Sequence, residues 1–572
     1  MLSSLLISLL LSIYAPPVDY DILLAGNFGE PRPHHFHGGL DISTDNVEGK
    51  HIYAIGDGYV SRVTQGLYGF GNAVYVTHPE GYTSVYCHLK SFSPRIKAAL
   101  RRYQYEHQTS VPDARLSPLV CPVSRGQFIA LSGNTGNSTG PHLHLEIHDT
   151  RTWDMLDPYE FIGDHISDTI PPQAHSLMAC PQQGVVCGNS RKQVFGFSSH
   201  QLSRELTAWG RVGFALWADD YMQGTYHHYG VREQILMCDG QVVFRALVNR
   251  VPVGQNRFVN SWGDYDHWLH HRVWFLKSFV DPGNRLPILS ADASRGIIDF
   301  CEERPYRLEY ILRDYKGNES HYAFTVRGEK PASQGESGES GYPGYSGYSG
   351  YPGYPGYSGE SGDARVFHWS QTNSYSLPGE MQLVVPYGLL ADDVALKPEV
   401  TRRPDQMADW YAFHPVSCPL VSDGELYIRP RLDNIGADSI LHTEADHSKL
   451  YVRTADGRFM GGEYHDGWVM GRIRDLGLTY TLDYDDEPPS VQPLSLGERI
   501  VLRLADRKSG VASFTATIDD RFVVFEQLDK SLTVVCDLSE TPLRRTGRQH
   551  RLKFSATDNR QNTTVYETNI NY

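Results

Sequence analysis

Long helix-periodic stretches are scarce in this sequence of 572 residues. Glycine, tyrosine and proline are abundant instead, with 53, 35 and 33 residues. Short alternating runs bounded by turn residues are typical of β-sandwiches and barrels. Because the chain is too long for one hydrophobic core, it predicts roughly three to four domains of ~150 residues each. The sequence therefore predicts a mainly β, multidomain protein.

Positive charge is also in deficit, since the formal net charge is −15. This balance disfavours nucleic acid or an anionic membrane as a partner, but not a neutral peptide as a substrate. The apolar stretch at residues 1–15 is too short for a transmembrane span. Its short apolar core and final small residue are typical of a signal peptide, with cleavage at Ala15 as one site. We expect residues 1–17 to direct export to the periplasm or the exterior.

Closely spaced cysteine pairs of the metal-binding kind are missing. An exported protein can form disulfides, and Cys180 with Cys187 is the best local candidate pair. Cys238 with Cys301 is the second candidate. The other four cysteines are interpreted as buried free thiols.

The helical zinc motif His-Glu-x-x-His is absent, and its glutamate general base is absent with it. The sequence contains instead His37-Gly-Gly-Leu-Asp41, His88 and His142-Leu-His144. Catalytic zinc takes three protein ligands and leaves one position open for water. These residues can supply three ligands and leave two imidazoles over.

Local geometry favours convergence of these side chains. If residues 142–145 form a strand, its period of two places both histidines on one face. His37 and Asp41, four residues apart, share a face in a strand or a helix, and the two glycines between them argue against the helix. Glu146 lies on the histidine face by the same parity. It either orients His144 as a hydrogen-bond acceptor or faces water.

Further motifs surround these residues: Asn27-Phe-Gly-Glu-Pro-Arg32, Gly56-Asp-Gly-Tyr-Val60, Gly69-Phe-Gly-Asn72, Tyr86-Cys-His-Leu89, Ser132-Gly-Asn-Thr-Gly136 and Gly140-Pro-His-Leu-His-Leu-Glu146. Together they resemble the lysostaphin-type (LytM-like) zinc endopeptidases of bacterial cell walls. The resemblance covers roughly the first third of the chain and leaves the rest uncovered.

The resemblance implies one zinc ion per chain, with His37, Asp41 and His144 as its ligands. It implies that His88 and His142 are the catalytic histidines, one as base and one as oxyanion stabiliser, without deciding which is which. His34 and His35 lack an aspartate at the family spacing and are interpreted as polar residues at the groove edge. A cupin metal site is a weaker alternative, because it has no place for Asp41 or for the Gly-Asn-Thr-Gly turn.

The predicted organisation has six parts. They are a signal peptide (1–17), a zinc metallopeptidase domain (18–166), an immunoglobulin-like β-sandwich (167–330), a low-complexity linker (331–364), a β-rich domain (365–485) and a second immunoglobulin-like β-sandwich (486–572). The linker has glycine at every third position and is interpreted as flexible rather than as a collagen triple helix. Within the peptidase domain, residues 94–107 have helical spacing and either wall the substrate groove or cover the sheet.

The two sandwiches are inferred from an internal repeat. Asp168-Thr-Ile-Pro-Pro172 is matched by Asp486-Glu-Pro-Pro489. The run 307–314 with Asn318 is matched by the run 551–558 with Asn562. Such alternating strands that end in Asp and Asn turn residues are typical of immunoglobulin-like sandwiches.

These observations predict an exported zinc endopeptidase that cuts the stem-peptide crosslinks of peptidoglycan. The sandwiches would position it on the wall or on a protein partner. A non-hydrolytic wall-binding scaffold, or an activator of another wall hydrolase, is the alternative. An adhesion module to which the peptidase is secondary is a third hypothesis.

Overall fold

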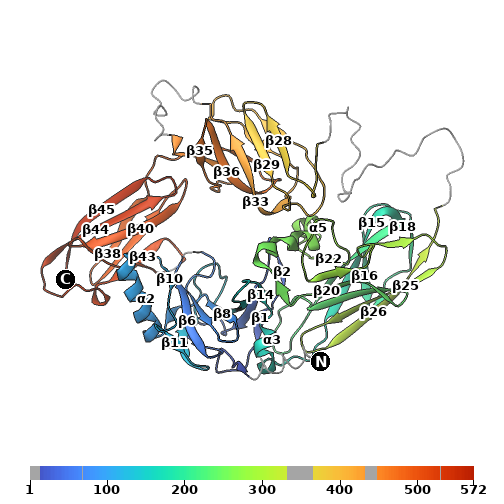
Figure 1. Cartoon of the computed structure of the whole chain (residues 1–572), viewed down its shortest axis with the longest axis horizontal. Coiled ribbons are helices and arrows are strands. Elements are labelled where there is room, and N and C mark those ends of the chain that lie inside the picture. Colours follow the sequence, from blue (N-terminus) through green and yellow to red (C-terminus); the bar gives the residue numbers. More distant parts are fainter. Residues whose placement is uncertain (1–12, 67, 332–364, 432–446, 529) are drawn as a thin grey trace.

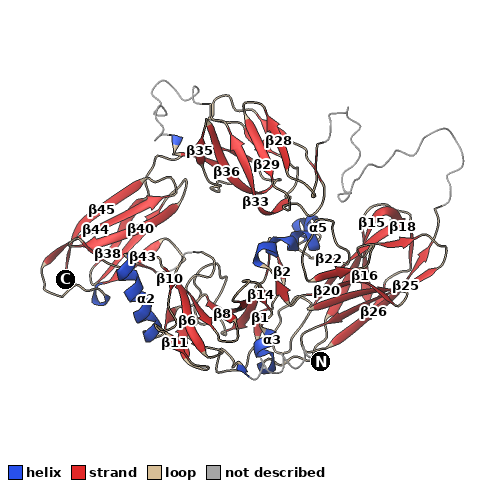
Figure 2. Cartoon of the chain, viewed as in Figure 1, coloured by secondary structure: helices blue, strands red, loops and turns tan. Residues whose placement is uncertain are grey.

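The computed structural model describes residues 13–66, 68–331, 365–431, 447–528 and 530–572. These residues are mostly β, as predicted (Figure 2). Most of the expected signal peptide, at residues 1–12, and nearly all of the expected linker, at 332–364, lie outside the described residues. Among the described helices, none has the length and apolar character needed to cross a membrane.

The N-terminal part is built on a ten-stranded sheet in which antiparallel neighbours carry the motifs of the sequence. Its main path runs β1 (Leu24–Gly26), β4 (Gly39–Ser43), β13 (His142–Asp149), β8 (Tyr82–Cys87), β7 (Ala73–Thr77), β6 (Gly58–Thr64) and β10 (Asp113–Arg115). Strand β13 alternates as predicted, because Leu143, Leu145 and Ile147 are fully buried in the core. The histidines between them point to the other face.

Helix α2 (Pro94–His107) occupies the predicted residues, begins at a proline and buries Ile96 and Leu100 against the sheet. The helix does not line the groove described below. Its outer face instead contacts the C-terminal part of the chain, where Lys97 lies 2.6 Å from Glu540 and Arg101 lies 3.1 Å from Glu526. Of the two alternatives for these residues, the structure therefore has the sheet cover and not the groove wall.

Residues 13–17 pack against this N-terminal part. Tyr14 is only 2% exposed and its ring meets Phe161 edge to face. The Ala15 N–H donates to the carbonyl of Ile55. Cleavage after Ala15 would remove Tyr14 from this packing.

The second part is an eleven-stranded sheet whose core is continuous with that of the N-terminal part. Its main path runs β17 (Gln201–Leu202), β16 (Gln193–Ser198), β15 (Gln173–Val186), β18 (Leu206–Asp219), β26 (Glu319–Gly328), β25 (Pro305–Arg313), β19 (Glu233–Cys238), β20 (Gln241–Leu247) and β23 (Leu289–Ala291).

Besides a two-stranded sheet of β27 (Val366–Phe367) and β30 (Val394–Ala395), the third part contains two larger sheets around a separate core. One runs β28 (Asn373–Leu377), β29 (Met381–Val385), β33 (Pro419–Ile428), β36 (Trp468–Asp475) and β35 (Glu463–His465). The other runs β31 (Glu399–Thr401), β32 (Trp410–Ala412), β37 (Tyr480–Tyr484) and β34 (Leu450–Thr454).

The fourth part has two four-stranded sheets around its own core. The first runs β38 (Ser490–Leu496), β39 (Arg499–Ala505), β43 (Thr533–Asp537) and β42 (Glu526–Gln527). The second runs β41 (Arg521–Phe522), β40 (Val511–Ile518), β44 (Gln549–Asp558) and β45 (Thr563–Asn571).

The four parts form a ring, which Figure 1 shows from blue at the bottom to red at the left. The second part meets the third where the Gly283 N–H donates to the carbonyl of Ala391. The third meets the fourth where Arg560 donates to the carbonyl of Gly462, at 2.9 Å. Helix α2 of the first part contacts the fourth part, and this contact closes the ring.

The internal repeat is visible as a shared local structure, with one correction to its register. The Asn318 amide donates to the carbonyl of Asp168, and the Asn562 amide donates in the same way to Asp485. Asp485, rather than Asp486, is therefore the structural equivalent of Asp168.

All eight cysteines are free, so the two expected disulfides are not formed. Cys180 lies in a buried apolar cluster with Phe275 and Phe279, while Cys301 is exposed. Cys87 packs as a small core residue beside Tyr75 and Val85, as predicted.

Candidate metal centre

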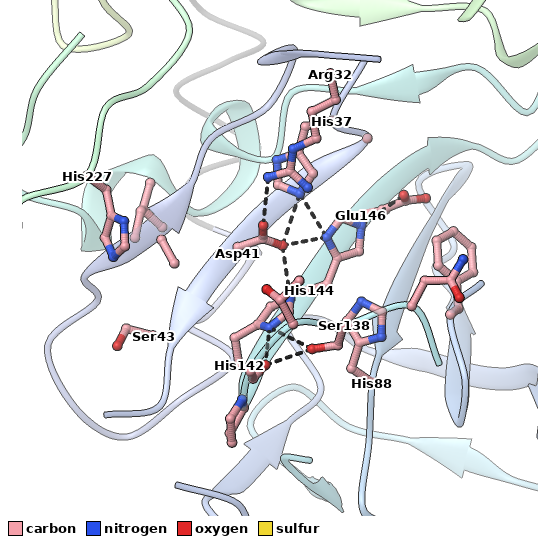
Figure 3. A pocket seen from close by; sticks show the side chains of 18 of the residues that line it. Arg32, His37, Asp41, Ser43, His88, Ser138, His142, His144, Glu146 and His227 are labelled. Atoms are coloured by element: carbon pink, nitrogen blue, oxygen red, sulfur yellow. Dashed lines mark hydrogen bonds and ion pairs between the residues drawn. The ribbon is translucent and has the colours of Figure 1, made fainter. Parts of the chain in front are cut away.

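A groove of about 1050 Å³ lies on the histidine face of β13. All five residues singled out from the sequence line it: His37, Asp41, His88, His142 and His144. Figure 3 shows their side chains turned toward one another.

The register between β4 and β13 brings the first three candidates together. Asp41 is directly opposite His144 across the two strands, and His37 lies two residues before the first residue of β4. Gly38 and Gly39 permit this close approach. A Cβ at Gly39 would lie 2.1 Å from the backbone oxygen of Leu145, and one at Gly38 would lie 2.4 Å from a Glu146 carboxylate oxygen.

Three potential ligand atoms converge at the centre of this arrangement. His37 Nε2 lies 3.0 Å from both Asp41 Oδ1 and His144 Nδ1, and those two atoms are 2.7 Å apart. Ligands about 2.0–2.2 Å from a tetrahedral zinc ion are separated by roughly 3.3 Å. A small outward movement of the side chains would thus admit the ion. Two imidazoles and one carboxylate are a donor set that suits catalytic zinc.

Hydrogen bonds on the outer sides of the two imidazoles fix which nitrogen faces the centre. His37 Nδ1 lies 2.6 Å from the carbonyl of Asn27, and a carbonyl only accepts, so this nitrogen carries the proton. His144 Nε2 donates in the same way to Glu146, at 2.9 Å. Glu146 in turn accepts from His148 Nε2 at 2.6 Å. His37 Nε2 and His144 Nδ1 are therefore the nitrogens that face the centre, and each can bind a metal when its ring is neutral.

Neighbouring charges shift the pKa values of Asp41 and His144. Burial alone would raise the pKa of Asp41, but His37, His142 and His144 hold it well below its usual range. Arg32 adds an ion pair of 3.0 Å to the second oxygen of Asp41, which leaves Oδ1 free for a metal. Burial alone would lower the pKa of His144, whereas hydrogen bonds to Asp41 and Glu146 raise it to about 9.

Two tightly packed glycine loops position His88. A Cβ at Gly71 would lie 2.5 Å from the backbone of Thr135, and one at Gly136 would lie 2.4 Å from the oxygen of Gly69. The carbonyl of Thr135 then accepts from His88 Nδ1 at 2.8 Å. Burial, with His144 and His142 nearby, lowers the pKa of His88 to about 3, so its imidazole is neutral at physiological pH.

His142 is held similarly at the end of β13. Its Nδ1 lies 2.8 Å from the carbonyl of Gly140, and its Nε2 lies 3.3 Å from Asp41 Oδ1. The rings of His142 and His88 are 4.9 Å apart. Ligand atoms of His88, His142 and His144 also lie within 4.8 Å of one another, so the geometry alone offers a second, overlapping group of three.

The structure adds residues that sequence reasoning missed. Arg32, the carbonyl of Asn27 and His148 all contact the centre or its first neighbours. The parity of β13 could have revealed His148, since it continues the face of His142, His144 and Glu146. A main-chain carbonyl carries no such sequence pattern. Of the two further histidines, His35 lines the groove as predicted, whereas His34 bonds to Asn260 and Tyr265.

Replacing Glu146 with glutamine should lower the affinity for zinc by about 10–100-fold, because the acceptor that orients His144 would lose its charge. Competition with a zinc-binding dye measures this affinity. Asp149→Asn, at the far end of the same strand, is the matched control and should leave it unchanged. Equal zinc affinity in Glu146→Gln and wild-type protein would exclude the orienting role.

Zinc binding should release about one proton per chain at pH 7.5, because His144 is protonated in the metal-free protein and must be neutral as a ligand. Calorimetry in buffers of different ionisation enthalpy measures the proton count. The raised pKa also means that His144 stabilises the metal-free fold fully below pH ~6.5 and loses this contribution as the pH rises through about 9. A proton count near zero would contradict this account.

Comparisons with known proteins agree with this geometry. Residues 35–104 match the model of Peptidase family M23, and residues 364–485 match that of the Zu5-like domain. An uncharacterized metalloprotease of Haemophilus influenzae is 38% identical over 120 residues, which are 21% of this chain and 19% of that protein. The peptidoglycan DD-endopeptidase ShyA of Vibrio cholerae is 34% identical over 137 residues, which are 23% of this chain and 26% of that protein.

Among solved structures, a zinc-containing peptidase from Vibrio cholerae is 29% identical, with a TM-score of 0.19, and the match covers 25% of this chain and 38% of that one. The chain thus matches only about a fifth to a quarter of the length of the curated relatives. The matched segment contains His37, Asp41 and His88, and the strand that carries His142 and His144 pairs directly with it. The chain carries a Peptidase family M23 domain, followed by a Zu5-like domain and further β-sheet structure.

Proposed function

We propose that this protein is an exported, zinc-dependent endopeptidase that hydrolyses peptide crosslinks of peptidoglycan. The observation that carries the proposal is the convergence of all five predicted side chains in one groove. The curated relative ShyA is named as a peptidoglycan DD-endopeptidase, which supports the substrate class.

In this proposal His37 Nε2, Asp41 Oδ1 and His144 Nδ1 hold the metal. When bound, zinc polarises the scissile carbonyl and lowers the pKa of a water molecule toward neutrality. The remaining chemistry is proton transfer by groups of the chain itself.

His88 and His142 are suited to this proton transfer. A backbone carbonyl accepts from Nδ1 of each ring, so Nε2 of each is the nitrogen that remains to exchange a proton. The neutral state of His88 suits a proton acceptor. His142, beside the Asp41 carboxylate, suits a donor that stabilises negative charge on the substrate oxygen.

The first sandwich supplies part of the same groove. Its loop at residues 224–227 lines the groove opposite the histidines, and Tyr226 is 85% exposed there. Figure 3 shows His227 of this loop on the other side of Asp41 from His88. An exposed aromatic ring at the edge of a peptide groove can contact the substrate without touching the reacting atoms.

Tyr226→Ala should raise KM for a peptidoglycan fragment several-fold, by roughly 1 kcal/mol of lost contact, and leave kcat unchanged. Steady-state kinetics with a purified crosslinked muropeptide measures both constants. His228→Ala is the control, because His228 is exposed in the same loop but does not line the groove. An unchanged KM in Tyr226→Ala would place the substrate elsewhere.

The function itself is tested by incubating zinc-loaded protein with purified peptidoglycan and analysing the released muropeptides by mass spectrometry. The proposal predicts loss of crosslinked dimers and the appearance of new peptide ends. Unchanged muropeptides, with protein that has bound zinc, would favour the non-hydrolytic scaffold instead. Cell fractionation tests export separately, and a cytoplasmic location would contradict that part.

A further inference from the structure

A second cluster of metal-binding character lies outside the groove, where the peptidase domain meets the first sandwich. Carboxylate oxygens of Asp168, Asp220 and Asp314 all lie within 4.8 Å of one another. Asp168 precedes β15, Asp220 directly follows β18 and Asp314 directly follows β25. Three chain segments therefore bring one carboxylate each to the same point.

One oxygen of these carboxylates is buried without a hydrogen-bond partner. Asp220 is 7% exposed, and its Oδ1 has no hydrogen-bond partner among the described residues. A buried, unsatisfied polar atom is rare in folded proteins, and a bound ion is one of its ordinary explanations. Burial, with Asp314 and Asp168 close by, raises the pKa of Asp220 to about 9.

Local cations do not neutralise the cluster. Within the described ranges, no lysine, arginine or histidine forms an ion pair with any of the three carboxylates. Arg232 and Lys316 line the same small cavity, of about 10 Å³. Arg232 pairs with Asp157 and Glu160, and Lys316 donates to a backbone carbonyl. The volume of this cavity is about what one water molecule or one ion needs.

The same arrangement recurs in the last sandwich. Asp485, Asp506 and Asp558 form an equivalent group within 4.8 Å. The strand registers establish the equivalence, because Gln173 pairs with Asp219 and its counterpart Ser490 pairs with Ala505. Asp220 directly follows Asp219, and Asp506 directly follows Ala505, so the two aspartates occupy equivalent positions.

The second cluster also contains an unsatisfied group. Asp485 and Asp558 are fully buried, and the buried hydroxyl of Ser509 beside them has no partner among the described residues. The guanidinium of Arg560 lies close enough to interact with both carboxylates. We expect this positive charge to weaken cation binding relative to the first cluster.

We propose that each cluster binds one hard divalent cation of the calcium type, at the two joints where a sandwich follows another domain. Several carboxylate oxygens in a flexible arrangement are the ligands that Ca²⁺ prefers, whereas zinc favours nitrogen and sulfur and Mg²⁺ keeps most of its waters. The first ion has a further consequence for the groove. Asp220 pairs with Tyr229 through both backbone hydrogen bonds, so a cation on Asp220 fixes the base of the loop that carries Tyr226.

The test uses full-length, zinc-loaded protein freed of other cations. Equilibrium dialysis with ⁴⁵Ca²⁺ should give two bound ions per chain, with a dissociation constant near ~10⁻⁴ M at the tighter site, and about 1 mM Mg²⁺ should compete weakly. Asp220→Asn should remove the tighter ion and Asp506→Asn the weaker one. The matched control Asp219→Asn, next to the cluster but paired with His175, should retain both.

Thermal unfolding provides a second readout that does not depend on enzyme activity. Saturating calcium should raise the Tm of the wild-type protein by about 4 °C or more, and the rise should be largely lost in Asp220→Asn. Without calcium, Asp220→Asn should unfold at the same or a higher temperature than wild type, because it replaces a buried acid crowded by Asp168 and Asp314 with a neutral amide. Zinc content is measured on the same samples and should not change.

No bound calcium in the wild-type protein up to about 10 mM, or equal binding by wild type and Asp220→Asn, would overturn the proposal. If the wild-type protein binds a single calcium ion, and only Asp220→Asn removes it, the proposal is wrong for the cluster of the last sandwich.

Discussion

Replacement of His144 by alanine is expected to abolish zinc binding and peptidoglycan cleavage together. His144 on β13 contacts both acidic residues of the centre, with Nδ1 2.7 Å from Asp41 Oδ1 and Nε2 2.9 Å from Glu146. Loss of the metal removes several kcal/mol of stabilisation of the reacting oxygen, so cleavage should fall by at least about 10³-fold. Elemental analysis and the muropeptide assay measure the two losses on one sample.

His165→Ala, at an exposed helical turn outside the groove, is the control and should keep both zinc and activity. Circular dichroism should show that both variants are folded, because removing a buried charged group leaves the hydrophobic face of β13 intact. Cleavage by His144→Ala at the wild-type rate would exclude the metal centre as the site of chemistry.

The second large effect separates proton transfer from metal binding. His88→Ala and His142→Ala should each keep one zinc per chain and lower kcat by about 10²–10⁴-fold, the range for a positioned acid or base. In His88→Ala the acidic limb of the pH–rate profile should also change, since the proposed proton acceptor is missing.

His51→Ala, an exposed histidine on another sheet, serves as the control for these two variants. Loss of zinc from His88→Ala or His142→Ala would contradict the division of roles. It would show that the overlapping group of His88, His142 and His144 holds the metal instead.

Much of the candidate site could be predicted from the sequence, because local periodicity determines it. The alternation of β13 alone places His142, His144 and Glu146 on one face, and the structure has them there. The same local rules placed α2 at its observed residues. The roles of the five side chains stay predictions, as do the domain boundaries and the immunoglobulin-like assignment of the sandwiches.

The parts that sequence reasoning missed depend on contacts between distant segments. The salt bridge from Lys97 to Glu540 joins residues 443 positions apart, and no local periodicity in the sequence predicts it. The disulfide expectations failed for a similar reason, since spacing along the chain says little about where two cysteines lie in a sheet. The repeat was found in sequence but misaligned at Asp486, because only the hydrogen bond from Asn562 identifies Asp485.

Anomalous diffraction at the zinc absorption edge, on crystals of the zinc-loaded protein, tests the central claim most directly. The account predicts a peak about 2.0–2.2 Å from His37 Nε2, Asp41 Oδ1 and His144 Nδ1, with His88 and His142 beyond bonding distance. A peak bound by His88 and His142, or no peak in this groove, would contradict it.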